Sequence, residues 1–162
     1  MRTQGAAVPV RPRAMALMLF CRARARLCAF PLEHLEETMR PLPVEPLSGA
    51  PRFVLGLSVI RGAPAPVIDA GALVGEAAPP APARFVTLKA GTRRVALAVE
   101  TVIGIRELGP ASLHDLPPLL REAGAGVVAT IGSLDGELLL VLDRARLVPQ
   151  SVWETLESGE VA

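Results

Sequence analysis

Short apolar runs separated by glycine and proline dominate the chain, and this pattern predicts strands and tight turns rather than long helices. The clearest case is the segment 56–69, where two apolar arms flank a turn at Arg61-Gly62. β-Branched residues in both arms favour a buried, pleated surface, so we predict a hairpin. Pro64 and Pro66 cannot donate to a ladder, and the second arm should therefore lie at a sheet edge or carry a bulge.

The same succession of strand, turn and strand recurs over 130–143. The matched positions are Gly62 with Gly136 and Asp69 with Asp143, 74 residues apart, and the blocks 28–35 and 95–102, 67 residues apart. The two offsets require a net difference of seven residues between the halves. A fixed internal repeat indicates one architecture that is used twice.

Other apolar runs and turn signals predict the remaining elements of each half. The first half is expected to hold strands over 14–21 and 26–31, a helical turn or strand over 32–40, and a proline-rich loop over 41–51. The second half is expected to hold strands over 84–88, 94–99, 100–108, 127–134 and 137–142, with a helix that begins near Pro117 or Pro118 and ends at Gly124.

Many short strands in two similar halves are typical of an all-β fold made of small barrels. We expect the first barrel over about 27–83 and the second over about 84–150, with the N-terminal strand shared. A disordered tail over 1–14 precedes them, and a short helix and tail over 151–162 follow. The predicted buried positions are Val59, Ile68, Val99, Ile131 and Leu142.

Composition and charge narrow the possible functions. The 162 residues are 51% hydrophobic but 3% aromatic, and the formal net charge is +1. Such a chain has neither the positive field nor the stacking platforms that nucleic acid binding requires. The apolar run 14–21 is shorter than the ~18 residues of a membrane span, so we expect a cytoplasmic protein without direct membrane insertion.

Residues that could carry chemistry are few. Cys21 and Cys28 are expected to be buried free thiols, and with His34 and His114 they are too few and too scattered to predict a metal site. No nucleophile motif or phosphate-binding loop is present in the sequence, so we predict no catalysis and no cofactor. A binding or scaffold module remains, in which Arg61 is either a solvated turn residue or a partner contact.

Four segments in order resemble the CheW-like domain of bacterial chemotaxis coupling proteins, between Met15 and Val148. They are Leu35-Glu36-Glu37, Gly56 to Asp69 with its Arg61-Gly62 turn and Pro66-Val67-Ile68-Asp69 end, Ala96 to Val102, and Leu134 to Asp143. The chain departs from the family pattern at Ala70-Gly71, where Leu-Arg is usual, and at Glu100, where Asp is usual.

The resemblance implies two five-stranded SH3-like barrels packed around a shared apolar core, with short helices. It also implies an adaptor that couples chemoreceptors to a CheA-type histidine kinase, at receptor arrays on the inner face of the membrane. Its partners would be the kinase regulatory domain and the cytoplasmic tip of the receptor. The alternative is an accessory regulator that binds the kinase but no receptor.

The resemblance also assigns partner-binding positions. Arg61 and Glu37 match residues that pair near the contact surfaces, and Gly56, Val102 and Ile105 match groove or interface positions. Leu35, the apolar residue of the Leu35-Glu36-Glu37 segment, is assigned as a further partner-binding position.

Overall fold

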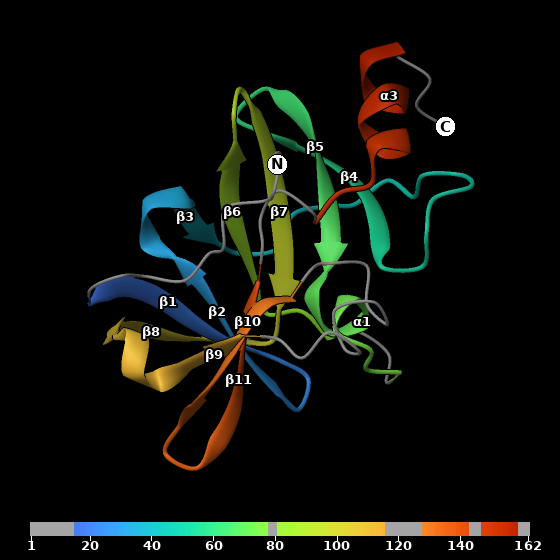
Figure 1. Cartoon of the computed structure of the whole chain (residues 1–162). Helices are drawn as coiled ribbons and strands as arrows, with labels where there is room; N and C mark the ends of the chain where they lie inside the picture. Colours follow the sequence, from blue (N-terminus) through green and yellow to red (C-terminus); the bar gives the residue numbers. More distant parts are fainter. Residues whose placement is uncertain (1–14, 78–80, 116–127, 143–146, 159–162) are drawn as a thin grey trace, which may run out of the picture.

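The computed structural model describes residues 15–77, 81–115, 128–142 and 147–158, which form two β-sheets and a few short helices (Figure 1). The strands are β1 (Ala16–Ala23), β2 (Arg26–Pro31), β3 (Leu35–Met39), β4 (Val54–Ile60), β5 (Ala63–Asp69), β6 (Arg84–Ala90), β7 (Arg93–Val99), β8 (Thr101–Leu108), β9 (Leu113–Asp115), β10 (Val128–Leu134) and β11 (Glu137–Leu142). The helices are η1 (Leu32–His34), α1 (Ala70–Leu73), η2 (Pro110–Ser112) and α3 (Gln150–Ser158). The predicted tail over 1–14, the helix from Pro117 to Gly124 and Asp143 lie outside the described residues.

The all-β fold class is confirmed, with one difference in strand number. One sheet has the order β3-β6-β7-β5-β4, and the other has six strands in the order β8-β1-β2-β11-β10-β9. The sixth strand arises because the short segment β9, which follows the single turn η2, pairs with β10 through Leu113 and His114. Both structures considered for 32–40 are present, since η1 leads directly into β3.

The sheets do not follow the two consecutive halves that we predicted. The hairpin β1–β2 lies in the same sheet as β8 to β11, whereas β6–β7 lies in the sheet of β3 to β5. Two parallel strand pairs attach each of these hairpins to its sheet, since β2 pairs with β11 and β7 pairs with β5. The internal repeat is present in the structure, because the order β8-β1-β2-β11-β10 in one sheet corresponds to the order β3-β6-β7-β5-β4 in the other. However, the first hairpin of each half belongs to the sheet that contains the remaining strands of the other half.

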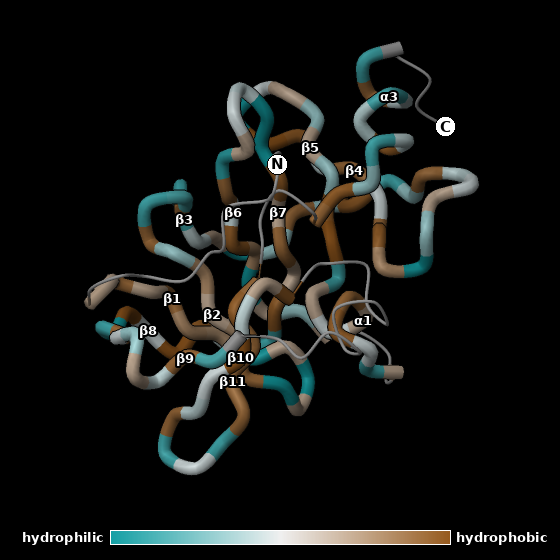
Figure 2. Tube along the Cα trace, viewed as in Figure 1, coloured by the Kyte–Doolittle hydropathy of each residue, from teal (hydrophilic) through white to brown (hydrophobic). Residues whose placement is uncertain are grey.

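The predicted shared apolar core lies between the sheets. Each sheet also has a private core, which is a hydrophobic cluster formed by its own strands on the face away from the shared core. Strand residues alternate between the two cores, so Cys28 and Phe30 face the shared core while Leu27 and Ala29 face the private core. β7 divides in the same manner, since Val95, Leu97 and Val99 lie in the shared core and Ala96 and Ala98 in the private one. Figure 2 shows hydrophobic residues along the middles of the strands and hydrophilic residues at the hairpin ends.

Four of the five positions predicted to be buried lie at least partly in the interior. Ile68, Val99 and Leu142 are fully buried, and Ile131 is half-buried. Val59 contradicts the prediction, since its side chain is 69% exposed. The reason is its place near the end of β4, which is the outer strand of its sheet.

The proline-containing arm is an interior strand rather than an edge strand. β5 lies between β4 and β7, but its parallel pairing with β7 involves only Val67, Ile68 and Asp69. Pro64 and Pro66 occupy the part of β5 that pairs with β4 alone. A residue without an N–H is tolerated there because no second ladder passes these positions.

A buried ion pair joins the two sheets at the turn between β1 and β2. Arg24 has a left-handed backbone with φ of 55°, and its guanidinium donates to both carboxylate oxygens of Asp69 at 2.5 and 2.6 Å. Only 7% of the Arg24 side chain and 4% of the Asp69 side chain are exposed. The Arg24 backbone N–H also donates to Glu100 at 2.7 Å. Gly71 leaves the space for this guanidinium, because a Cβ there would lie 1.9 Å from Nη1 of Arg24.

We predict that Arg24→Ala lowers the free energy of unfolding by about 3 to 5 kcal/mol, because it leaves the buried Asp69 carboxylate without its counter-ion. Urea denaturation measures the loss. The control is Arg26→Ala, which removes an exposed pair with Glu76 and should cost less than about 1 kcal/mol. Equal effects of the two substitutions would contradict the assignment of Arg24 as the residue that joins the sheets.

Candidate functional site

The resemblance placed Arg61 beside Glu37, and the structure brings these two side chains into contact. Arg61 begins the turn between β4 and β5 with φ of 51°, and Gly62 follows with φ of 81°. Nε of Arg61 donates to Glu37 on β3 at 2.6 Å. The Arg61 side chain remains 61% exposed, against 27% for Glu37, so the pair lies at the surface. Asp135 and Gly136 form a matching turn in the other sheet, with φ of 51° and 79°.

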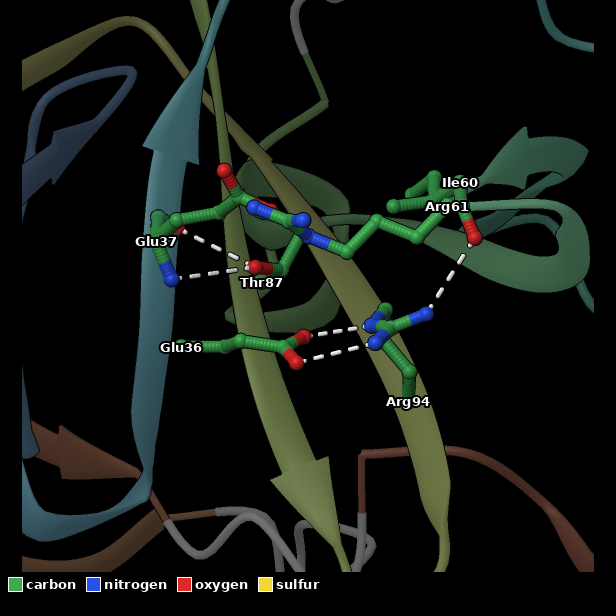
Figure 3. A network of polar contacts seen from close by, with 6 residues as sticks. All are labelled: Glu36, Glu37, Ile60, Arg61, Thr87 and Arg94. Carbon is green, nitrogen blue, oxygen red and sulfur yellow. Dashed lines mark hydrogen bonds and ion pairs between the residues drawn. The ribbon is translucent and has the colours of Figure 1, made fainter.

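A second arginine–glutamate pair lies beside the first (Figure 3). Arg94 on β7 donates to both carboxylate oxygens of Glu36, and Nη1 of Arg94 donates to the carbonyl oxygen of Ile60 at 3.2 Å. Hydrogen bonding to Arg94 lowers the pKa of Glu36 below its ordinary value. Because Ile60 directly precedes Arg61, this hydrogen bond connects the Arg94–Glu36 pair to the backbone beside Arg61.

A β-bulge explains how two consecutive glutamates reach two arginines. Leu35 pairs with Leu88 and Glu37 pairs with Thr87, so Glu36 is the extra residue of β3. The Thr87 hydroxyl accepts from the Glu37 N–H at 3.1 Å and donates to the Glu37 carbonyl at 3.2 Å. Sequence reasoning missed Glu36, Thr87 and Arg94, because the pairing of β3 with β6 joins segments from different halves of the repeat.

The remaining predicted site residues are divided between the sheets. Leu35 begins β3 and is half-buried against the shared core. Val102 and Ile105 lie on β8 in the six-stranded sheet, where Val102 packs against the shared core and Ile105 is 52% exposed. Their roles in partner binding stay predictions.

Gly56 is explained by a close approach of the backbone. It lies on β4 with φ of 145°, and a Cβ there would lie 2.0 Å from the carbonyl oxygen of Glu45. Leu57 and Glu45 exchange backbone hydrogen bonds of 2.8 Å in each direction, which fixes the loop against this strand. A structural requirement for glycine therefore exists here whether or not a partner touches the position.

The two cysteines do not form a reactive centre. Cys21 and Cys28 face each other across β1 and β2, and both are fully buried. Burial raises the pKa of Cys28 to about 12 and that of Cys21 well above its ordinary value. Among the described residues, no group of three or more His, Cys, Asp and Glu side chains is arranged to hold a metal ion. No helix in the described part of the chain has the length and hydrophobicity to span a bilayer.

We predict that Gly56→Ala lowers the free energy of unfolding by about 2 kcal/mol more than Gly104→Ala, because only the first substitution overpacks its surroundings. Gly104 is a matched control, since it has the same φ of 145° but no atom within 4 Å of an added Cβ. Thermal melts of the two variants measure the difference. Equal melting temperatures would show that the loop over 41–51 moves away from an added Cβ without loss of stability.

We predict that iodoacetamide at about pH 8 leaves Cys21 and Cys28 unmodified in the native protein, because thiols with raised pKa values hold little reactive thiolate. Mass spectrometry counts the adducts, and the same reagent in concentrated urea should label both residues. Rapid labelling without urea would mean that the β1–β2 hairpin opens.

Comparison with known proteins agrees with this fold. The scaffolding protein TtCheW from Thermoanaerobacter tengcongensis, known from a crystal structure, superposes with a TM-score of 0.67 at 18% sequence identity, covering 80% of this chain and 89% of that chain. No curated protein matches the sequence. The model of the CheW-like domain matches residues 17–152, which is most of the chain. The chain therefore belongs to the CheW-like domain family.

Proposed function

We propose that the chain is a non-catalytic adaptor that couples chemoreceptors to a CheA-type histidine kinase. The observation that carries the proposal is the exposed pair of Arg61 and Glu37. Exposed ion pairs contribute less than about 1 kcal/mol to stability, so folding alone does not require this pair. An arginine whose Nε is paired with a carboxylate at a hairpin tip is suited to recognise carboxylates or carbonyls of a partner protein.

The contact with Glu37 orients the guanidinium through Nε, while most of the side chain remains accessible. Arg94 supports this arrangement, because it holds Glu36 beside Glu37 and also binds the Ile60 carbonyl next to Arg61. The four charged residues thus form one polar patch. We infer that the patch orients Arg61 toward the receptor or the kinase.

Apolar contact area is available on the other sheet. Leu17 on β1 is exposed, and so are Ile103 and Ile105 on the outer strand β8. Exposed apolar side chains on an outer strand are suited to protein partners. We infer that this surface binds the kinase regulatory domain, and that Leu35 and Val102, near the shared core, contact the receptor tip. This assignment would place the protein at receptor arrays on the inner face of the membrane.

We predict that Arg61→Ala weakens recruitment into a receptor–kinase complex by about tenfold or more, which is about 1.4 kcal/mol, and leaves the melting curve nearly unchanged. Arg61→Lys should restore binding only in part, because an ammonium group lacks the planar fork. Co-sedimentation with receptor fragments and kinase measures recruitment, and thermal melts of each variant measure stability.

Arg26→Ala is the matched control, because it also removes an exposed arginine whose Nε binds a glutamate. Binding of Arg61→Ala at the parental level would make Arg61 a solvated turn residue and remove the main support for the proposal. Separate pull-downs test the two partners. Capture of the kinase regulatory domain without the receptor fragment would favour the accessory regulator instead.

A further inference from the structure

A groove lies between helix α3 and the tips of the hairpins β4–β5 and β6–β7, with a cavity volume of about 480 Å³. Figure 1 shows α3 beside this end of the five-stranded sheet. Neither β8 nor Arg61 and Glu37 line the groove, but Arg94, which binds Glu36, does. The proposed function gives it no role.

The groove has an apolar side. Pro64 of β5 and Trp153 and Leu156 of α3 line it. Val59 pairs directly with Pro64, and residues that face each other across an antiparallel pair project on the same side of the sheet. Val59 is the most exposed large hydrophobic residue of the described chain, and it lies next to Pro64, outside the residues that line the groove.

The groove also has a basic side. Lys89, Arg93 and Arg94 line it, against the carboxylate of Glu157, but Arg94 is already bound by Glu36. The chain as a whole has a formal net charge of only +1, so Lys89 and Arg93 beside the one Glu157 give this groove a local excess of positive charge. A ligand for this groove therefore carries negative charge beside its apolar groups.

Helix α3 already places an apolar ring and a carboxylate against the groove, through Trp153 and Glu157. The Arg93 guanidinium lies 4.7 Å from the centroid of the Trp153 ring and also donates to Glu157. Both partners of the Arg93–Glu157 pair are exposed, at 37% and 58%, so the pair is weakly held. An incoming carboxylate can replace Glu157 on Arg93 at little cost.

We propose that this groove binds an acidic segment of a partner protein that places an apolar side chain between carboxylates. The apolar side chain would lie against Pro64, Trp153 and Val59, and the carboxylates would pair with Lys89 and Arg93. A second copy of the chain fits the groove less well, because a symmetric contact would bring two basic surfaces together.

The test uses the full chain and a short blocked, fluorescein-labelled peptide with two leucines between pairs of glutamates. Anisotropy measures its affinity, and the fluorescence of Trp153, the only tryptophan in the chain, reports whether it binds in the groove. We expect saturable binding that weakens with salt and is lost when the glutamates are replaced by glutamine or the leucines by serine. No kinase or receptor is present, so failure here leaves the adaptor function untouched.

Arg93→Glu should weaken binding at least tenfold, and Val59→Ser severalfold. The matched control Arg106→Glu reverses an exposed arginine of β8 in the other sheet and should change affinity less than twofold. Val59→Ser carries the test if Arg93→Glu fails to fold, because the Val59 side chain is exposed. Absent binding, an unchanged Trp153 signal, or equal losses for Arg93→Glu and Arg106→Glu would overturn the proposal. A dimer of the chain alone that Arg93→Glu dissociates would assign the groove to a second copy and also overturn it.

Discussion

The structure depends on burying both faces of its central strands. In β1, β2, β6 and β7, alternate residues face either the shared core or the private core of one sheet. Such strands must be apolar at nearly every position, which explains the continuous apolar runs and the hydrophobic content of 51%. In these four strands the charged side chains then lie near the strand ends, and elsewhere they gather at hairpin tips and on outer strands. The Arg61–Glu37 pair, the exposed part of β8 and the groove beside α3 all occupy such places.

Local features of this fold could be predicted from the sequence, and long-range pairings could not. The turn at Arg61-Gly62 and its repeat at Asp135-Gly136 depend on neighbouring residues, and all four residues have positive φ values. The exchange of hairpins depends on parallel pairing between distant segments, such as Leu27 with Leu139, which leaves no periodic signal along the chain. The contact between Arg94 and Glu36 could not be predicted for the same reason, since the order of strands in the sheet brings these two residues together.

Gly71 and Glu100, two of the positions where the chain departs from the expected family pattern, both lie beside Arg24. Gly71 has no side chain to obstruct the Arg24 guanidinium, and Glu100 accepts the Arg24 N–H at 2.7 Å. Arg24 therefore supplies a cation to Asp69 from the β1–β2 turn. Three residues that lie far apart in the sequence, Arg24, Gly71 and Glu100, have a common explanation in one buried ion pair.

The exchange of hairpins has a consequence for synthesis on the ribosome. The β1–β2 hairpin emerges early, but its neighbours β8 and β11 are made only after the whole five-stranded sheet has been translated. Until then, the apolar residues of β1 and β2 that face the core of their own sheet have no permanent cover, and partly made chains expose aggregation-prone strands. Pairings that join distant parts of the chain are also slow to form, because a long loop must close first. Completion of the polypeptide, rather than of either half, is thus the step that protects the nascent protein from aggregation.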